Sequence, residues 1–233
     1  MKAMILAAGR GTRMAPLTDN CPKPLIPLAG KPLIEHHIEK LVAAGVRDIV
    51  INHAYLGFMI EDALGDGSRW SCSIRYSAED QALETAGGII KALPLLATES
   101  NEPFLLINGD VWLDWDYGNA FAIAENFDQQ QEGFLWLVKN PDHNPAGDFA
   151  LTDNGQVLSQ INDAGWTFSG VSLLSPRLFT DLPEGVRPLA PVLRQAMERG
   201  TIHGQVLPCD WVDVGTPERL ASLEQTLLRK IPG

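Results

Sequence analysis

The residues best suited to chemistry in this sequence are glycines and basic side chains near its N-terminus. The stretch 6–18 reads LAAGRGTRMAPLT and directly follows a short apolar run. Small residues let the backbone approach a ligand closely, and exposed N–H groups there can hold phosphate oxygens. Arg13 can add a charge-assisted hydrogen bond, and Lys23, between two prolines, offers a positive charge on a stiff backbone. This combination favours phosphate binding.

The glycine spacing on its own has a second explanation. Gly9-Arg10-Gly11 matches neither the GxGxxG dinucleotide fingerprint nor the GxxxxGK[ST] P-loop. A plain glycine turn between a strand and a helix has the same composition. The glycines therefore indicate a phosphate site only in combination with the neighbouring cations.

Two aspartates at the ends of apolar runs have the chemistry of metal ligands. Asp110 ends the run FLLINGD, and Asp213 lies within WVDVGT. Mg²⁺ takes oxygen ligands and is commonly held by one or two carboxylates beside substrate phosphates. Aspartate is also a frequent turn former and helix cap, so composition alone favours a structural role for both residues.

The elements that position these residues alternate between strands and helices. Apolar runs predict buried strands at 3–7, 49–51, 74–76 and 104–107. Amphipathic stretches predict helices at 33–44, 60–64 and 89–96. This order predicts parallel βαβ units, and therefore an α/β fold whose sheet carries helices on both faces. Ligands bind at the carboxyl ends of strands in such sheets, which is where 8–18 and 108–116 lie.

The second half of the chain is less regular. Strands are predicted at 135–138, 150–151, 157–161 and 168–174, and a helix at 189–197. A last helix begins near Thr216, with Thr216 as its N-cap and Pro217 in its first turn. No repeat, low-complexity segment or linker stands out. We therefore predict a single domain over residues 1–233, with a mixed, mostly parallel sheet.

The acidic composition narrows the classes of partner. The formal net charge of −11 argues against a general nucleic-acid binder, although a few local cations still suit a phosphate ligand. No apolar run of about 18 residues predicts a membrane span. Three widely spaced cysteines and an N-terminus without a full signal-peptide pattern favour a reduced, cytoplasmic protein. A monomer or a small homo-oligomer is expected.

The opening stretch and the two aspartate motifs together resemble the sugar-1-phosphate nucleotidyltransferase family. That family opens with LAAGxGTRMxPLT followed by a KP lysine, and every fixed position is present here. Its metal ligands lie in (N/G)GD and WxDxGT motifs, which Asp110 and Asp213 match. The resemblance implies a Rossmann-like nucleotidyltransferase domain that uses Mg²⁺. Such an enzyme joins a nucleoside monophosphate from a nucleoside triphosphate to a sugar phosphate and releases pyrophosphate.

The resemblance also implies roles for individual residues. Arg13 and Lys23 would neutralise phosphate charge during catalysis. The family's loops imply that the nucleotide is bound by Ala8, Gly9, Gly11, Thr12, Arg13, Lys23, Glu79, Thr85, Gly87 and Asn108. Its later segments imply that the sugar is contacted by Asp148, Ser169 and Gly170. Asp148 also suits a turn after Gly147.

The loop expected beside the base departs from the family pattern, which reads roughly QxxxxGTAGA. Glu79 stands in place of the glutamine that contacts the base, and Glu84 in place of the first glycine. Both glutamates also suit a solvated acidic loop. The departure leaves the choice among UTP, dTTP, CTP and GTP open.

Five stretches are similar to family members that act on N-acetylmuramate α-1-phosphate, namely 50–54, 64–68, 83–89, 108–112 and 211–216. In those members a glutamate at position 84 is expected. The similarity implies UTP and this sugar phosphate as substrates, in peptidoglycan recycling. The alternatives are a mannose- or heptose-1-phosphate guanylyltransferase and a non-catalytic, sugar-nucleotide-binding regulatory subunit. No C-terminal β-helix domain is expected, because the sequence has no hexapeptide repeats.

Overall fold

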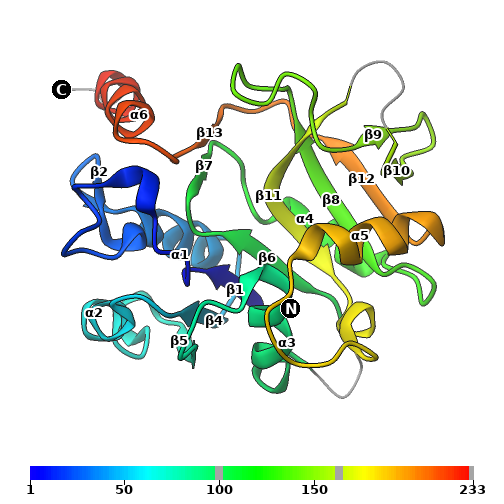
Figure 1. Ribbon diagram of the computed structural model, residues 1–233, viewed down its shortest axis with the longest axis horizontal. Helices are drawn as coiled ribbons and strands as arrows, with labels where there is room; N and C mark the ends of the chain where they lie inside the picture. The colour runs from blue at the N-terminus through cyan, green and yellow to red at the C-terminus, as the bar shows by residue number, and fades with distance from the viewer. Residues whose placement is uncertain (98–101, 161–164, 231–233) are drawn as a thin grey trace.

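The computed structural model describes residues 1–97, 102–160 and 165–230. A seven-stranded sheet with the strand order β12-β8-β11-β6-β1-β4-β5 runs through the molecule (Figure 1). Its strands are β1 (Ala3–Leu6), β4 (Asp48–His53), β5 (Ser73–Ala78), β6 (Phe104–Asn108), β8 (Gly133–Val138), β11 (Thr167–Leu174) and β12 (Ile202–Val206). The α-helices are α1 (Leu33–Ala43), α2 (Gly57–Leu64), α3 (Glu84–Leu96), α4 (Asn119–Glu125), α5 (Leu189–Glu198) and α6 (Pro217–Lys230).

The directions of the strands confirm the predicted mixed, mostly parallel sheet. Strand β1 pairs in parallel with β4 and β6, β4 pairs in parallel with β5, and β12 pairs in parallel with β8. Strand β11 is the exception, because it runs antiparallel to both of its neighbours, β6 and β8. The fold is therefore of the α/β class.

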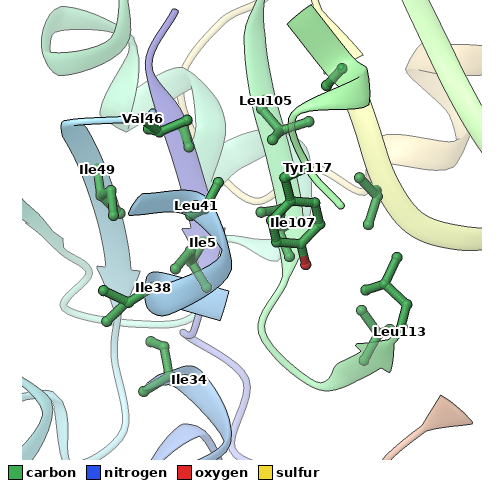
Figure 2. Packing of buried hydrophobic residues seen from close by; sticks show 14 of the residues in the cluster. Ile5, Ile34, Ile38, Leu41, Val46, Ile49, Leu105, Ile107, Leu113 and Tyr117 are labelled. Carbon is green, nitrogen blue, oxygen red and sulfur yellow. The ribbon is translucent and has the colours of Figure 1, made fainter. Parts of the chain in front are cut away.

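Alternating side chains of the strands feed two separate cores, because successive residues of a strand point to opposite faces of the sheet. Ile5 and Ile107 pack with α1, α2 and α4 on one face. Met4 and Leu106 pack with α3 and α5 on the other. The predicted helices on both faces are thus present. Figure 2 shows the first core, where the apolar side of α1 lies against the sheet.

Three two-stranded sheets extend the fold beyond the main sheet. Strand β7 (Val111–Leu113) pairs with β13 (Trp211–Asp213), β9 (Ala150–Leu151) with β10 (Val157–Leu158), and β2 (Pro27–Leu28) with β3 (Lys31–Pro32). A third apolar cluster joins Met14 near the N-terminus to Leu220 and Leu223 of α6. Figure 1 shows α6 at one end of the molecule, next to β13. The C-terminal helix therefore packs against the N-terminal part of the chain.

Some elements differ from the prediction. Helix α3 begins at Glu84 rather than at position 89, because Gly87 and Gly88 weaken the helical pattern although they lie within the helix. Helix α4 and the half-polar edge strand β12 were not predicted. Of the strand predicted at 157–161 the structure has β10, and Ile161 lies outside the described residues. No helix in the described ranges is long and apolar enough to cross a membrane.

Candidate active site

A cavity of about 460 Å³ lies where β1, β4 and β6 end. These strands are in register there, since Leu6 pairs with both Asn52 and Asn108, and all three residues line the cavity. The volume is in the range of small-molecule sites. The predicted site residues that line it are Ala8, Gly9, Gly11, Thr12, Arg13, Lys23, Thr85, Asn108 and Asp110. These predicted residues therefore meet at one cavity, at the carboxyl ends of the strands.

The loop after β1 is shaped by Gly11 and by one turn of 3₁₀-helix, η1 (Thr12–Met14). Gly11 has a φ of 67°, in the left-handed region that favours glycine. Its carbonyl accepts hydrogen bonds from the Met14 N–H at 2.8 Å and from the Thr18 hydroxyl at 2.9 Å. Met14 is buried, whereas Arg13 is exposed and lines the cavity. The loop thus leaves Arg13 at the cavity while Met14 is buried.

Lys23 and Asp110 form an ion pair in the cavity lining. The Lys23 ammonium donates a hydrogen bond to Asp110 Oδ2 at 2.7 Å. The Lys23 side chain is only 9% exposed, whereas that of Asp110 is 42% exposed. A 3₁₀ turn, η2 (Lys23–Leu25), holds the lysine, with Pro22 before it and Pro24 within it. The lysine is therefore a fixed, nearly buried cation beside an accessible carboxylate.

The backbone of Asp213 lies next to that of Asp110 although the two are far apart in sequence, but Asp213 itself does not line the cavity. The β7–β13 pairing sets Asp213 opposite Val111, and the Val214 N–H donates to the Asp110 carbonyl at 2.9 Å. Asp213 Oδ2 lies 3.1 Å from Arg219 Nη1 and 3.3 Å from His143 Nε2. Each of the two aspartates predicted as metal ligands is thus next to a basic side chain.

The chemistry of this donor set fits Mg²⁺. Asp110 and Asp213 offer carboxylate oxygens from neighbouring backbone positions, and Mg²⁺ is commonly held by one or two carboxylates together with phosphate oxygens and water. Within the described residues, no group of three His, Cys, Asp or Glu side chains converges on one point. A cation bound here would therefore complete its coordination with oxygens from the substrate and from water.

The loop that the resemblance places beside the base is organised by Glu79, which does not line the cavity. Glu79 is 6% exposed, so it is not part of a solvated acidic loop. Its carboxylate accepts hydrogen bonds from the side chain of Asn52 and from the N–H of Leu83. Glu84 is exposed, lines the cavity and has a φ of 61°, in the left-handed region that favours glycine, and the family pattern has a glycine at this position.

Gly87 also lies away from the cavity lining. It is buried within α3, and its N–H donates to the carbonyl of Arg187. A Cβ at this position would lie 2.3 Å from the carbonyl oxygen of Gly185. The structure therefore gives Gly87 a packing role, and its contact with a nucleotide stays a prediction.

The three residues predicted to contact the sugar also lie outside the lining. Asp148 accepts hydrogen bonds from Asn144 Nδ2 at 3.1 Å and from the Phe168 N–H at 2.8 Å, so it orders its own loop. Ser169 has no exposed surface. Gly170 lies against the cavity-lining Asn108, since a Cβ on Gly170 would lie 2.9 Å from the Asn108 side chain. Their roles in sugar binding stay predictions.

Some residues of the lining were not predicted, among them Arg10, Pro24, Ala82, Gly109 and Gly215. Arg10 adds a third cation, and its guanidinium carbon lies 4.9 Å from the centre of the Tyr55 ring. The family pattern leaves this position variable, so the resemblance assigned it no role. Only its place between Gly9 and Gly11 could have indicated from the sequence that Arg10 lines the cavity.

Backbone N–H groups and cations that gather around one cavity, beside two neighbouring carboxylates, suit a ligand with several phosphates. This geometry defines a class of α/β enzymes that act on phosphate esters or anhydrides. Within that class the chain belongs to the nucleotidyl transferase family, because the family model described as Nucleotidyl transferase matches residues 2–162. The predicted family is thereby confirmed.

Relatives of known name match almost the full length of the chain. The chain is 52% identical over 223 residues to an N-acetylmuramate alpha-1-phosphate uridylyltransferase of Neisseria meningitidis, which covers 94% of this chain and 95% of the relative. It is 32% identical to a protein of the same name from Caulobacter vibrioides, over 97% of this chain and 96% of the relative.

A solved structure supports the fold. A Bacillus anthracis protein assigned as a glucose-1-phosphate thymidylyltransferase, in complex with sucrose, superimposes with a TM-score of 0.86 at 22% identity. The match covers 100% of this chain and 97% of that one. At this identity the likeness concerns the fold alone.

Proposed function

We propose that this protein transfers UMP from UTP to N-acetylmuramate α-1-phosphate and releases pyrophosphate. The observation that carries the proposal is the 52% identity to the Neisseria uridylyltransferase, which extends over 94% of this chain. The cavity supports it, because the glycine-rich loop, Arg13 and Lys23 lie together at the edge of the sheet. Mg²⁺ as the cation, a cytoplasmic location and a place in peptidoglycan recycling belong to the same proposal.

The proposed reaction needs no nucleophile from the protein. An oxygen of the sugar phosphate attacks the α-phosphorus of UTP, a new P–O bond forms, and the bond to the bridging oxygen of pyrophosphate breaks. Pyrophosphate leaves with that electron pair. The work of the protein is then to position the two substrates and to stabilise charge.

The cavity residues divide this work between backbone and side chains. The N–H groups around Gly9 and Gly11 would hold triphosphate oxygens, and Arg13 would stabilise negative charge that moves to the leaving pyrophosphate. Lys23, which lies beside Gly11, would supply a fixed positive charge. Asp110 and Asp213 would hold Mg²⁺, which when bound supplies further positive charge to the phosphate oxygens.

A matrix of nucleotides and sugar phosphates tests the proposal. UTP, dTTP, CTP and GTP are each combined with the 1-phosphates of N-acetylmuramate, mannose and glucose, and pyrophosphate release is measured. The fastest release is expected for UTP with N-acetylmuramate α-1-phosphate. A preference for GTP with mannose 1-phosphate would establish the guanylyltransferase alternative. Binding of a UDP-sugar without pyrophosphate release from any pair would establish the regulatory alternative.

A further inference from the structure

A chain of three hydrogen bonds, two of them buried and the third part-buried, joins the end of β1 to the loop that leads into α3. The Ala7 N–H donates to Asn52 Oδ1 at 3.0 Å. Asn52 Nδ2 donates to Glu79 Oε1 at 2.7 Å, and Glu79 Oε2 accepts from the Leu83 N–H at 2.9 Å. Asn52 is 2% exposed and Glu79 is 6% exposed. The two side chains in the middle of the chain of bonds are thus shielded from water.

The chemistry of these groups fixes the direction of every bond in the chain. A backbone N–H can only donate, so the Asn52 side chain must present its oxygen to Ala7 and its amide nitrogen to Glu79. The Leu83 N–H is also a donor. Glu79 therefore has to accept at both oxygens, which a carboxylate does and an amide cannot.

One end of the chain of bonds lines the cavity, and the other end lies between two residues that line it. Ala7 lines the cavity and leads into the glycine-rich loop. Leu83 is flanked by Ala82 and Glu84, which also line the cavity. Glu79 itself does not line it, although the family pattern has a base-contacting glutamine at this position.

Helix α3 is packed tightly against the middle of the chain of bonds. A Cβ on Gly88 would lie 2.6 Å from Glu79 Oε1 and 2.7 Å from Asn52 Nδ2. The backbone adds a further constraint, since the Glu79 N–H donates to the carbonyl of His53 at 2.8 Å. These contacts therefore restrict the Glu79 carboxylate to its position between Asn52 and the Leu83 N–H.

We propose that Glu79 is a positioning residue of the nucleotide site, which fixes the loop 80–84 relative to the glycine-rich loop through Asn52 and Leu83. It acts without touching the base. The base is then contacted by the residues of that loop which reach the cavity, Ala82 and Glu84, and by the adjacent Thr85. This inference rests on the proposed function for the identity of the ligand, but not for the hydrogen bonds themselves.

Two conservative substitutions and their combination test the proposal. In Glu79→Gln the side chain keeps one acceptor, so its amide nitrogen faces either Asn52 Nδ2 or the Leu83 N–H, and donor faces donor. In Asn52→Asp two carboxylates face each other. In the double variant, the new carboxylate at position 52 accepts from the Ala7 N–H and from the new amide nitrogen at position 79. The amide oxygen at position 79 accepts from the Leu83 N–H, so every bond is restored, with the middle one reversed.

The expected result is a loss in each single variant and a recovery in the double variant. Each single substitution is expected to raise KM for UTP about tenfold or more and to lower the urea midpoint, because a buried polar group loses its partner. The double variant is expected to return to within about threefold of the wild-type KM. Asp62→Asn removes a charge from an exposed position of α2 outside this loop and outside the cavity lining, and should match the wild type.

The ratio of activity with UTP to activity with GTP separates positioning from base contact. A positioning residue lowers kcat/KM for both nucleotides by a similar factor, so Glu79→Gln should leave the ratio unchanged. A changed ratio, or improved use of UTP, would overturn the proposal and restore Glu79 as a base contact. A double variant no better than the worse single variant would overturn it as well. If the wild type is inactive with UTP, the proposed function fails, while recovery of the urea midpoint still tests the chain of bonds.

Discussion

Asp110 forms an ion pair with Lys23, and its half-exposed carboxylate lines the cavity where we propose a metal. Asp110→Asn removes the charge while keeping the shape, and leaves the nearly buried Lys23 without its ion-pair partner. We expect pyrophosphate release to fall by roughly 100-fold or more. Binding of Mn²⁺ in the presence of UTP, measured by electron paramagnetic resonance, should weaken in parallel. Unchanged pyrophosphate release would remove Asp110 from the proposed mechanism.

A matched control for this prediction lies close by in the sequence. Asp114 carries the same charge, is 61% exposed and pairs with Lys230 at 3.6 Å. Exposed pairs of this kind contribute about 0–1 kcal/mol to stability. Asp114→Asn should therefore leave both activity and Mn²⁺ binding at wild-type values.

A side chain should be tolerated at Gly9 but not at Gly11, although the two glycines are only two positions apart. Gly11 has a positive φ, and a Cβ on it would lie 3.1 Å from both Lys23 Cβ and Thr18 Cγ2. Gly9 has no atom within 4 Å of a built Cβ. Gly11→Ala should lower the free energy of unfolding by about 1–2 kcal/mol, whereas Gly9→Ala should change it by about 0.5 kcal/mol or less. Urea unfolding of both variants measures this, and equal losses would contradict it.

Helices α1 and α4 are connected through a buried histidine, which makes their packing depend on pH. His37 on α1 lies with its Nδ1 2.8 Å from the hydroxyl of Tyr117, just before α4. Burial lowers the pKa of His37 from 6.5 to about 4. Between these pH values the unfolded chain takes up a proton that the folded protein does not. Stability from this residue is therefore complete above pH 6.5 and is lost as the pH falls toward 4.

His37→Gln removes this titration and should flatten the pH dependence. The wild type should lose up to about 1.4 kcal/mol of unfolding free energy per pH unit from His37 below its unfolded pKa. Urea unfolding at several pH values from 7.5 to 4.5, in the wild type and the variant, measures the difference in slope. Both proteins should have similar slopes above pH 7. Parallel curves below pH 6 would show that His37 does not control this dependence.

The elements of the first half follow from local patterns, whereas the assembly of the site does not. Apolar runs were sufficient for β1, β4 and β6, because these parallel strands are buried on both faces. The edge strand β5 was found from the short run 74–76, although it is only partly buried. Hydrophobic periodicity could not predict the burial of the polar residues Asn52 and Glu79. Asn52 bonds to Ala7, 45 residues before it, and to Glu79, 27 residues after it. Lys23 meets Asp110 across 87 positions. The family resemblance, and not spacing, brought those two residues together in the prediction.

Both halves of the chain share one sheet, so the molecule is expected to unfold as a single unit. Strands β8, β11 and β12 from the second half continue the sheet through the β11–β6 pairing, and β13 returns to β7 beside the cavity. The prediction of a single domain over residues 1–233 therefore requires one cooperative transition. Near-ultraviolet and far-ultraviolet circular dichroism should give coincident thermal curves. Two separated transitions would divide the chain into two domains.

Ligand binding should move that whole transition rather than a part of it, because the cavity wall contains residues from Leu6 to Gly215. Mg²⁺ with UTP at about 100 times its dissociation constant adds roughly 2.7 kcal/mol to the unfolding free energy. For a chain of this length that corresponds to a rise in Tm of roughly 5–10 °C. GTP at the same concentration should give a smaller rise, and Asp110→Asn should lose the part that depends on Mg²⁺. A larger rise with GTP than with UTP would reverse the proposed choice of nucleotide while leaving the family assignment intact.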